Sequence, residues 1–173
     1  MKQEKFNLKK IDSLLNYIAT IVIGLAIGKF ILMHIVVIVV VSGTSMMPTL
    51  HDGQKLICNK FIYNFNEPER FDIVAFEAED YEEKVLIKRV IGLPGEKLRI
   101  DINGNIYING KIIEDIDGLD KIKSPGLAIE EITIGEDEYF VMGDNRNNSL
   151  DSRFEIIGNV HIDDILGKCG NRQ

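Results

Sequence analysis

The sequence predicts a mostly β protein, with an antiparallel sheet or partial barrel placed behind one N-terminal transmembrane helix. Three observations lead to this prediction. A long apolar run near the N-terminus, over residues 13–28, contains no charged residue. Short β-branched runs bounded by polar, Gly or Pro residues follow it. Two Asn-Gly pairs, at 103–104 and 109–110, give the strongest short signal for a β-hairpin.

The charges are unevenly distributed along the chain. The net charge of the 173 residues is −7, residues 1–10 carry +3, and Asp12 and Lys29 cancel, so residues 30–173 carry −10. An acidic body argues against nucleic acid as a partner, because phosphates attract a basic face. The length suits one ordinary domain beside an anchor.

The apolar run is predicted to be a membrane anchor over residues 11–30, behind a basic tail over 1–10. Sixteen uncharged helical residues span about 24 Å, slightly less than the hydrocarbon core of about 30 Å. Ile11 and a snorkelling Lys29 extend the span, and we expect the helix to end near Lys29 or Phe30. No cleavage signal of small residues follows, so the anchor is predicted to stay uncleaved.

The basic tail also predicts the orientation in the plasma membrane. By the positive-inside rule the tail lies in the cytoplasm, so residues 31–173 form an extracytoplasmic, β-rich domain. His34 fits an interfacial polar residue just past the anchor.

Strands are predicted by composition and turn signals along the rest of the chain. The β-branched run at 35–41 is typical of a strand buried on both faces. Residues 114–131 are rich in acidic residues, so we expect a solvated loop there rather than core. The other predicted strands cover residues 54–62, 71–76, 85–91, 98–102, 105–108, 111–113 and 138–142.

Cysteine is scarce, since Cys58 and Cys169 are the only two. Neither a disulfide framework nor a Cys-x-x-Cys metal site is possible. The favoured interpretation is two small buried thiols. A single disulfide stays open, because the body is expected outside the cytoplasm.

Ser45 follows the apolar run within a segment of small residues and is the candidate nucleophile. A serine hydroxyl is weak until a neighbouring base takes its proton. The candidate bases are His51, His161 and the lysines, and His51 fits a surface turn better than a site.

Lys88 is the most interesting lysine, because Leu86, Lys88 and Val90 share one face of a predicted strand. Apolar neighbours can desolvate an ammonium and lower a lysine pKa from about 10.4, which leaves a neutral amine able to act as general base. Arg89 cannot do so, since guanidinium does not deprotonate in proteins. Periodicity alone favours an edge-strand lysine that reaches solvent.

Four separated blocks of this sequence, in order and behind an anchor, resemble the type I signal peptidases. These are membrane-bound serine proteases that remove signal peptides from exported proteins, and the short chain with one anchor is similar to their Gram-positive branch. The blocks are Gly-Thr-Ser-Met-Met-Pro-Thr-Leu at 43–50, Phe-Asp-Ile-Val-Ala-Phe at 71–76, Lys-Arg-Val-Ile-Gly-Leu-Pro-Gly-Glu at 88–96 and Gly-Asp-Asn-Arg-Asn-Asn-Ser-Leu-Asp-Ser-Arg at 143–153.

The resemblance implies roles for individual residues. Ser45 becomes the nucleophile and Lys88 the general base. Ser149 matches the serine that hydrogen-bonds and orients the lysine, and Asp151 and Arg153 match a structural ion pair beside the site. No cofactor or metal is implied.

The resemblance also implies the partners. Substrates are signal peptides of secreted precursors, with small residues at the first and third positions before the cut, bound in extended form against a β edge. Contact with membrane lipid and proximity to the protein-export channel are expected. The residues matching the substrate pockets are Val41, Ser42, Met46 and Ile87.

Two positions depart from the family pattern. Some members supply an oxyanion hydrogen bond from a serine two residues before the nucleophile, where this chain has Gly43. We therefore expect Ser45 N–H with a second donor, either a backbone amide or the Thr44 hydroxyl. Phe71 stands where the pattern usually has Gly, which leaves the local turn open.

Two alternative functions remain open at this point. A self-cleaving repressor-type Ser/Lys protease shares the Ser-Met pairing, but the anchor and the lack of a DNA-binding segment count against it. A membrane-tethered β module that only binds partners would use Ser45 and Lys88 as structural residues.

Overall fold

The computed structural model describes residues 2–78 and 85–170. Met1, residues 79–84 and residues 171–173, which fall within the predicted tail and extracytoplasmic domain, lie outside the described residues. The chain divides into two compact units, Met1–Val36 and Val37–Gln173.

The first unit is one helix, α1 (Lys2–His34), of 33 residues. Its segment Ser13–Ile31 has a mean hydropathy of 1.9 and is long and apolar enough to cross a membrane. The predicted end near Lys29 or Phe30 is wrong, because the helix continues to His34. Lys29 marks where the uncharged run ends, but no Gly or Pro follows it to stop the backbone hydrogen bonding.

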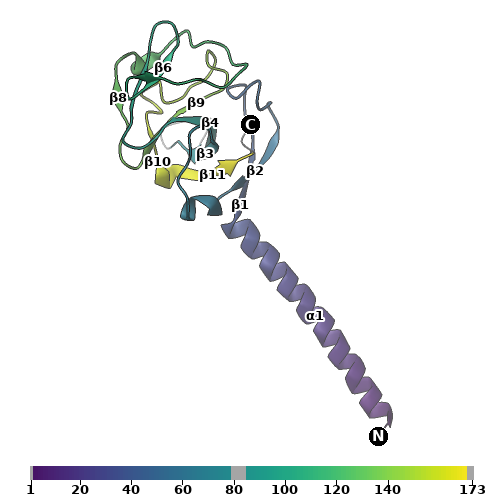
Figure 1. The fold of residues 1–173 in the computed structure, drawn as a ribbon. Helices are drawn as coiled ribbons and strands as arrows, with labels where there is room; N and C mark the ends of the chain where they lie inside the picture. Colours follow the sequence, from purple (N-terminus) through teal and green to yellow (C-terminus); the bar gives the residue numbers. More distant parts are fainter. Residues whose placement is uncertain (1, 79–84, 171–173) are drawn as a thin grey trace. The chain divides into compact units, whose positions relative to one another are not determined.

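The second unit contains a seven-stranded sheet, seen in the lower part of the body in Figure 1. Its pairs β2–β11, β11–β3, β3–β4, β4–β9 and β9–β10 are antiparallel. In spatial order the strands are β1 (Val36–Val40), β2 (Lys55–Asn59), β11 (Ile165–Cys169), β3 (Ile73–Glu77), β4 (Val85–Gly92), β9 (Glu138–Met142) and β10 (Val160–His161).

A smaller four-stranded sheet lies at the top of the body in Figure 1, where β6 and β8 are labelled. Its strands are paired antiparallel, and the two Asn-Gly segments separate β5 from β6 and β6 from β7, as predicted. The mostly antiparallel β fold behind one apolar helix is thereby confirmed. In spatial order the strands are β7 (Lys111–Ile112), β6 (Ile106–Ile108), β5 (Lys97–Ile100) and β8 (Ile132–Thr133). The described part of the body also contains the short 3-10 helices η1 (Phe61–Asn64), η2 (Gly126–Ile129) and η3 (Ile162–Asp164).

Strand β1 differs from its prediction in burial. The strand forms, but it lies at an edge of the sheet, and Ile38 and Val40 are 59% and 56% exposed. Val37 and Val39, on the other face, pack on the core. The expectation of burial on both faces is wrong, because β-branched composition favours a strand without reporting how many faces are covered.

Strands β3 and β4 form the buried centre of the large sheet. Successive side chains of a strand point to opposite faces. Val74 and Phe76 pack with Leu86 and Val90 in one apolar cluster. The alternate side chains of both strands, together with residues of the Ser45 loop, build the cluster on the other face, whose buried members are Val41, Met46, Leu50, Leu56, Cys58, Ile73, Ala75, Ile87 and Cys169.

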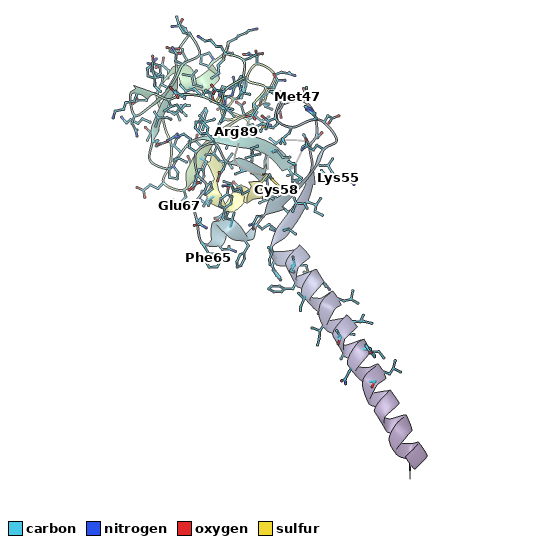
Figure 2. All side chains as sticks on the ribbon, turned by 45° about the vertical axis from the view of Figure 1, so that its right-hand side comes forward. Met47, Lys55, Cys58, Phe65, Glu67 and Arg89 are labelled. Atoms are coloured by element: carbon cyan, nitrogen blue, oxygen red, sulfur yellow. A yellow bond between two sulfur atoms is a disulfide. The ribbon has the colours of Figure 1, made fainter. Side chains whose placement is uncertain are left out.

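Cys58 and Cys169 form a disulfide. They face each other in the antiparallel register of β2 and β11, with a Cα–Cα distance of 4.0 Å, and both side chains are buried. Figure 2 shows Cys58 beside the yellow ribbon of β11. The favoured interpretation of two separate thiols is therefore wrong. The pairing could not be read from the sequence, because β11 had not been predicted and 111 residues separate the cysteines.

Removing this disulfide should destabilise the body. A crosslink closing a loop of about 100 residues stabilises a protein by about 4.7 kcal/mol in the chain-entropy account, within a usual range of about 2–5 kcal/mol. Replacing both cysteines by alanine in the full chain should lower the free energy of unfolding in detergent by that range. Urea unfolding followed by circular dichroism measures the difference, and the unmutated chain in reductant is the control. A change below about 0.5 kcal/mol, the size typical of neutral surface substitutions, would contradict a stabilising disulfide.

Candidate active site

Ser45 lies in the loop that joins β1 to β2. Val41, Met46 and Leu50 anchor this loop, because all three side chains are buried in the same apolar cluster. The Leu50 N–H donates to the Met46 carbonyl at 2.9 Å, and the Gly53 N–H to the Val41 carbonyl at 2.9 Å. Ser45 itself is half-buried between these anchors. The local sequence thus alternates buried apolar side chains with polar ones that face the loop surface.

Lys88 lies in the middle of β4 and is only 2% exposed. Its Nζ donates to Ser45 Oγ at 2.9 Å and to the Ile87 carbonyl at 3.2 Å. Leu86 and Val90, which the period-2 pattern placed beside Lys88, are also buried. Lys88 is therefore an interior residue and not an edge-strand lysine that reaches solvent. The two side chains singled out in the sequence as nucleophile and base are within hydrogen-bond reach, the geometric requirement for proton transfer.

The segment after β9, residues 143–153, also contacts the loop that carries Ser45. The Asn145 N–H donates to the Ser45 carbonyl at 2.9 Å, and the Asn145 Nδ2 to the Thr44 carbonyl at 3.1 Å. The Gly143 N–H donates to Asp151 Oδ2 at 3.0 Å. The loop of residues 143–153 thereby fixes the backbone on which the Ser45 hydroxyl is mounted.

Ser149 belongs to this loop, and its Oγ is buried without a hydrogen-bond partner. The hydrogen bond from Ser149 to Lys88 that the resemblance implies is therefore not formed in this structure. Ser149 lies against Gly143, where an added Cβ would overlap the Ser149 Oγ. The orienting role of Ser149 stays a prediction.

Asp151 and Arg153 form the expected ion pair. Arg153 Nε donates to Asp151 Oδ1 at 2.8 Å and its Nη2 to Oδ2 at 2.9 Å, with both residues buried. A bidentate Arg–carboxylate pair is among the stronger polar contacts in proteins. It stabilises the turn that carries Ser149, because Asp151 also accepts from the Gly143 N–H.

A second buried ion pair joins Arg89 and Asp144, and the sequence analysis missed it. Arg89 Nε and Nη2 donate to the two Asp144 oxygens at 2.8 and 2.6 Å. Arg89 is only 2% exposed, whereas Met47, at the edge of the body in Figure 2, is 38% exposed. The signal was available, because Arg89 stands between Ile87 and Ile91 on the opposite face of the strand from Lys88. A charge between two apolar neighbours on one strand face implies a buried partner.

Phe71, the second departure from the family pattern, adopts a left-handed backbone with φ of 72°. This conformation costs a non-glycine residue about 1–2 kcal/mol. Its carbonyl accepts from Arg89 Nη1 at 2.8 Å, and its ring packs against the apolar cluster of the small sheet. The turn therefore keeps the conformation that glycine favours, and the apolar packing offsets part of the cost.

Residues 114–131 were expected to be a solvated loop, and this is wrong for part of the segment. Ile122 and Ala128 are buried in the apolar cluster of the small sheet. Asp115 pairs with the fully buried Arg146 at 2.6 Å. Burial lowers the pKa of Arg146, and the Asp115 carboxylate acts in the opposite direction. The acidic composition of this segment predicted a solvated loop, because it does not reveal that single apolar residues are buried and that one carboxylate has a buried partner.

Further contacts attach this segment to the loop of residues 143–153. The Lys123 N–H donates to Asn147 Oδ1 at 2.9 Å, and the Asn147 Nδ2 donates to the Lys121 carbonyl at 3.0 Å. Arg153 Nη1 donates to the Ser124 carbonyl at 3.0 Å. Segment 114–131 thus supports the loop that wraps Ser45.

A cavity of about 220 Å³ opens beside Ser45 and Lys88. Its wall includes all four residues predicted for the substrate pockets, Val41, Ser42, Met46 and Ile87; the other lining residues are Val40, Gly43, Thr44, Val85, Leu86, Asn148 and Leu150. The four residues are thus gathered at one place, and their contact with substrate stays a prediction. Within the described residues, no group of three His, Cys, Asp or Glu side chains is placed to hold a metal ion.

One edge of β4 is open next to this cavity. Strand β3 pairs with β4 from Val85 to Arg89, whereas β9 pairs with it only from Arg89 to Gly92. Residues 85–88 therefore have no strand partner on the β9 side within the part of the chain that the structure describes. Such an edge can accept an extended peptide as an added strand.

Comparison with known proteins identifies the family. The profile of the family described as "Signal peptidase, peptidase S26" matches residues 14–172. The chain belongs to this family. A signal peptidase I of Bacillus amyloliquefaciens is 34% identical over 160 residues, covering 88% of this chain and 84% of that protein. A signal peptidase I of Bacillus caldolyticus is 41% identical over 144 residues, covering 77% and 76%. The crystal structure of a signal peptidase I from Enterococcus faecalis is 30% identical, with 60% and 97% coverage and a TM-score of 0.48.

As a type I signal peptidase, this chain is a serine-type hydrolase that cleaves signal peptides. The family match favours this activity over a repressor-type protease and over a module that only binds partners. The family and the apolar helix α1 together indicate a membrane-anchored protein.

Gly143→Ala should sharply reduce cleavage by this signal peptidase. An added Cβ would overlap Ser149 Oγ and lie 2.5 Å from the Ser45 carbonyl oxygen. Misplacing a reacting group by about 1 Å can cost about 10²-fold in rate, so we expect at least that loss in cleavage of a precursor. Gly110→Ala is the control, because its Cβ meets no atom within 4 Å although its φ is 76°. Equal activity of the two variants would show that the close contact at Gly143 is irrelevant to the site.

Proposed function

We propose that Ser45 and Lys88 form the catalytic dyad of this peptidase, with Ser45 as nucleophile and Lys88 as general base. The observation that carries the proposal is the 2.9 Å contact between Lys88 Nζ and Ser45 Oγ, made by a lysine that is 2% exposed. Burial disfavours the charged ammonium. A neutral amine at this distance can accept the Ser45 proton.

The reaction is acyl transfer in two halves. Lys88 takes the proton as Ser45 Oγ attacks the scissile carbonyl, and the resulting ammonium then protonates the leaving amine. Water, deprotonated by the same amine, hydrolyses the ester and regenerates Ser45. Every proton transfer uses Lys88 Nζ, so one buried amine is sufficient for both halves.

Ser149 is proposed to assist when Lys88 is protonated. Its Oγ is buried and makes no hydrogen bond with any described residue. A buried hydroxyl without a partner costs free energy, and it offers an acceptor to an ammonium. Asp151 and Arg153 support this position through the turn described above.

The substrate is proposed to be the extended end of a signal peptide. The open edge of β4 at residues 85–87 offers backbone groups to it, and the apolar walls at Val41, Met46 and Ile87 limit the size of its side chains. The β-branched Val41 and Ile87 and the side chain of Met46 occupy space beside Ser45, which favours small substrate side chains such as alanine over large ones. This supports cleavage after small residues at the first and third positions.

The body is proposed to lie outside the cytoplasm at the plasma membrane, with the basic N-terminus inside. The positive-inside rule supports this orientation. The Cys58–Cys169 disulfide supports it as well, because disulfides persist in oxidising compartments and are rare in the cytosol. The exposed Ile38 and Val40 offer an apolar face to lipid. Precursors would arrive there from the protein-export channel.

Removing either member of the dyad should abolish cleavage. Ser45→Ala and Lys88→Met each remove a group that acts in every step, so we expect a loss of at least about 10³-fold, within the range seen for removed catalytic groups. The rate is measured on a precursor with the purified full chain in detergent. Ser124→Ala and Lys55→Met are matched controls, because both residues are exposed, and they should cleave normally.

The dyad proposal has clear failing outcomes. Undiminished cleavage by either dyad variant, with the controls also active, would contradict it. Loss of activity in the controls as well would point to unfolding, and circular dichroism of all four variants separates that case.

Activity should rise with pH as Lys88 loses its proton. Only the neutral amine is a base, so the rate falls at low pH, where the ammonium predominates, and reaches a plateau above the Lys88 pKa. Single-turnover rates between about pH 6 and 10, the region around the lysine range, measure this profile. A flat profile across that window would contradict a lysine base.

A further inference from the structure

Acyl transfer places a negative charge on the carbonyl oxygen of the substrate, and this oxyanion needs hydrogen-bond donors. Losing one donor costs about 10²–10³-fold in rate. The Ser45 N–H makes no hydrogen bond with any described residue and can supply one. Gly43, two residues earlier, has no side chain, and its N–H already donates to Asp52 Oδ1 at 2.8 Å. A second donor must come from elsewhere in the cavity.

Thr44 and Asn148 form a hydrogen-bonded pair in the wall of that cavity. Asn148 Nδ2 donates to Thr44 Oγ1 at 3.1 Å, and both residues line the cavity together with Ser45 and Lys88. The Thr44 backbone is also held, because its carbonyl accepts from Asn145 Nδ2 and from the Met47 N–H, each at 3.1 Å. Thr44 is thus fixed both at its carbonyl and at its hydroxyl.

The direction of the Asn148 hydrogen bond decides what Thr44 can do. A threonine hydroxyl has one hydrogen to donate and two lone pairs that accept. Asn148 fills an acceptor position, so the Thr44 hydrogen points elsewhere and remains available. Accepting a hydrogen bond also polarises a hydroxyl and strengthens its own donation. Both residues are exposed in the free chain, and a peptide in the cavity would cover them.

We propose that the Thr44 hydroxyl is the second oxyanion donor and that Asn148 is the residue that positions it. The inference rests on the proposed Ser45–Lys88 dyad. When Ser45 Oγ bonds to the carbonyl carbon, the π electron pair moves to the carbonyl oxygen. That oxygen then accepts hydrogen bonds from the Ser45 N–H and the Thr44 O–H. Collapse of the tetrahedral intermediate returns the pair to the C=O bond and expels the amine.

Thr44→Val tests the donor, because it removes the hydroxyl and keeps the shape. We expect kcat for a precursor to fall about 10²–10³-fold with KM nearly unchanged, since the bond forms only as charge develops. Thr44→Ser keeps the hydroxyl and should retain most of the rate. Thr133→Val is the matched control, on the exposed face of β8. Wild-type kcat in Thr44→Val would overturn the proposal.

A pair of inhibitors separates catalysis from structure. A peptide aldehyde with alanine at its first and third positions forms a hemiacetal with Ser45, whereas the corresponding alcohol cannot. Thr44→Val should lose about 10²-fold or more in affinity for the aldehyde, in line with the loss in rate, and none for the alcohol. Equal loss for both inhibitors would overturn the proposal, because it would mean that Thr44 only shapes the cavity.

Asn148→Ala tests the positioning residue. Alone it should lower kcat about 10-fold, the size of one lost hydrogen bond of about 1.4 kcal/mol. In the Thr44→Val background it should have no further effect, because its action passes through Thr44. Additive losses would overturn the role of Asn148. If the unmutated chain neither cleaves a precursor nor binds the aldehyde, the dyad proposal is contradicted. If the unmutated chain does both and the Thr44→Val variant behaves in the same way, only the oxyanion role of Thr44 is contradicted.

Discussion

The structure depends on holding the Lys88 amine, almost free of solvent, within 2.9 Å of a serine hydroxyl. An amine withdrawn from water loses its hydration, and the surrounding contacts must offset that loss. Strand β4 meets the requirement through its two neighbours. Strand β3 pairs with it on one side from Val85 to Arg89, and β9 pairs with it on the other side from Arg89 onward. The backbone of Lys88 therefore lies where one neighbouring strand ends and the open edge begins, which lets a buried side chain reach a cavity.

Buried ion pairs stabilise residues 143–153, a segment beside the site with little regular secondary structure. Residues 143–153 form no strand or helix, so their backbone groups cannot rely on a sheet ladder. Three buried arginines supply the missing order, because Arg89 and Arg153 pair with carboxylates of the loop itself and Arg146 pairs with Asp115. Breaking one member of such a pair leaves an uncompensated charge in the interior. The conformation of the loop that wraps Ser45 is thus stabilised by ion pairs rather than by secondary structure.

Local patterns in the sequence were enough to predict the anchor, the hairpins and the strand that carries Lys88, because each has its own composition or period. They could not predict β11, whose five residues include Gly167 and Lys168 and alternate poorly, although this strand lies between β2 and β3. The disulfide was missed for the same reason. The Arg89–Asp144 pair and the buried parts of 114–131 depend on contacts between distant segments, which no local window contains. The meeting of Ser45 with Lys88, 43 residues apart, was suggested only by resemblance to a family.

Strand order explains why the disulfide and the candidate site share one apolar cluster. Strand β1 lies at the edge of the sheet, so within the described residues β2 is its one neighbour, and the Ser45 loop joins these two strands. The disulfide crosslinks β2 to β11, and β11 pairs with the central β3. Val41 and Met46, which line the cavity, pack in the same cluster as both cysteines. The hairpin that carries Ser45 is also held to the rest of the sheet by the β2–β11 pairing. The crosslink adds a covalent bond at the strand next to the edge, so it supports the shape of the cavity as well as the stability of the fold.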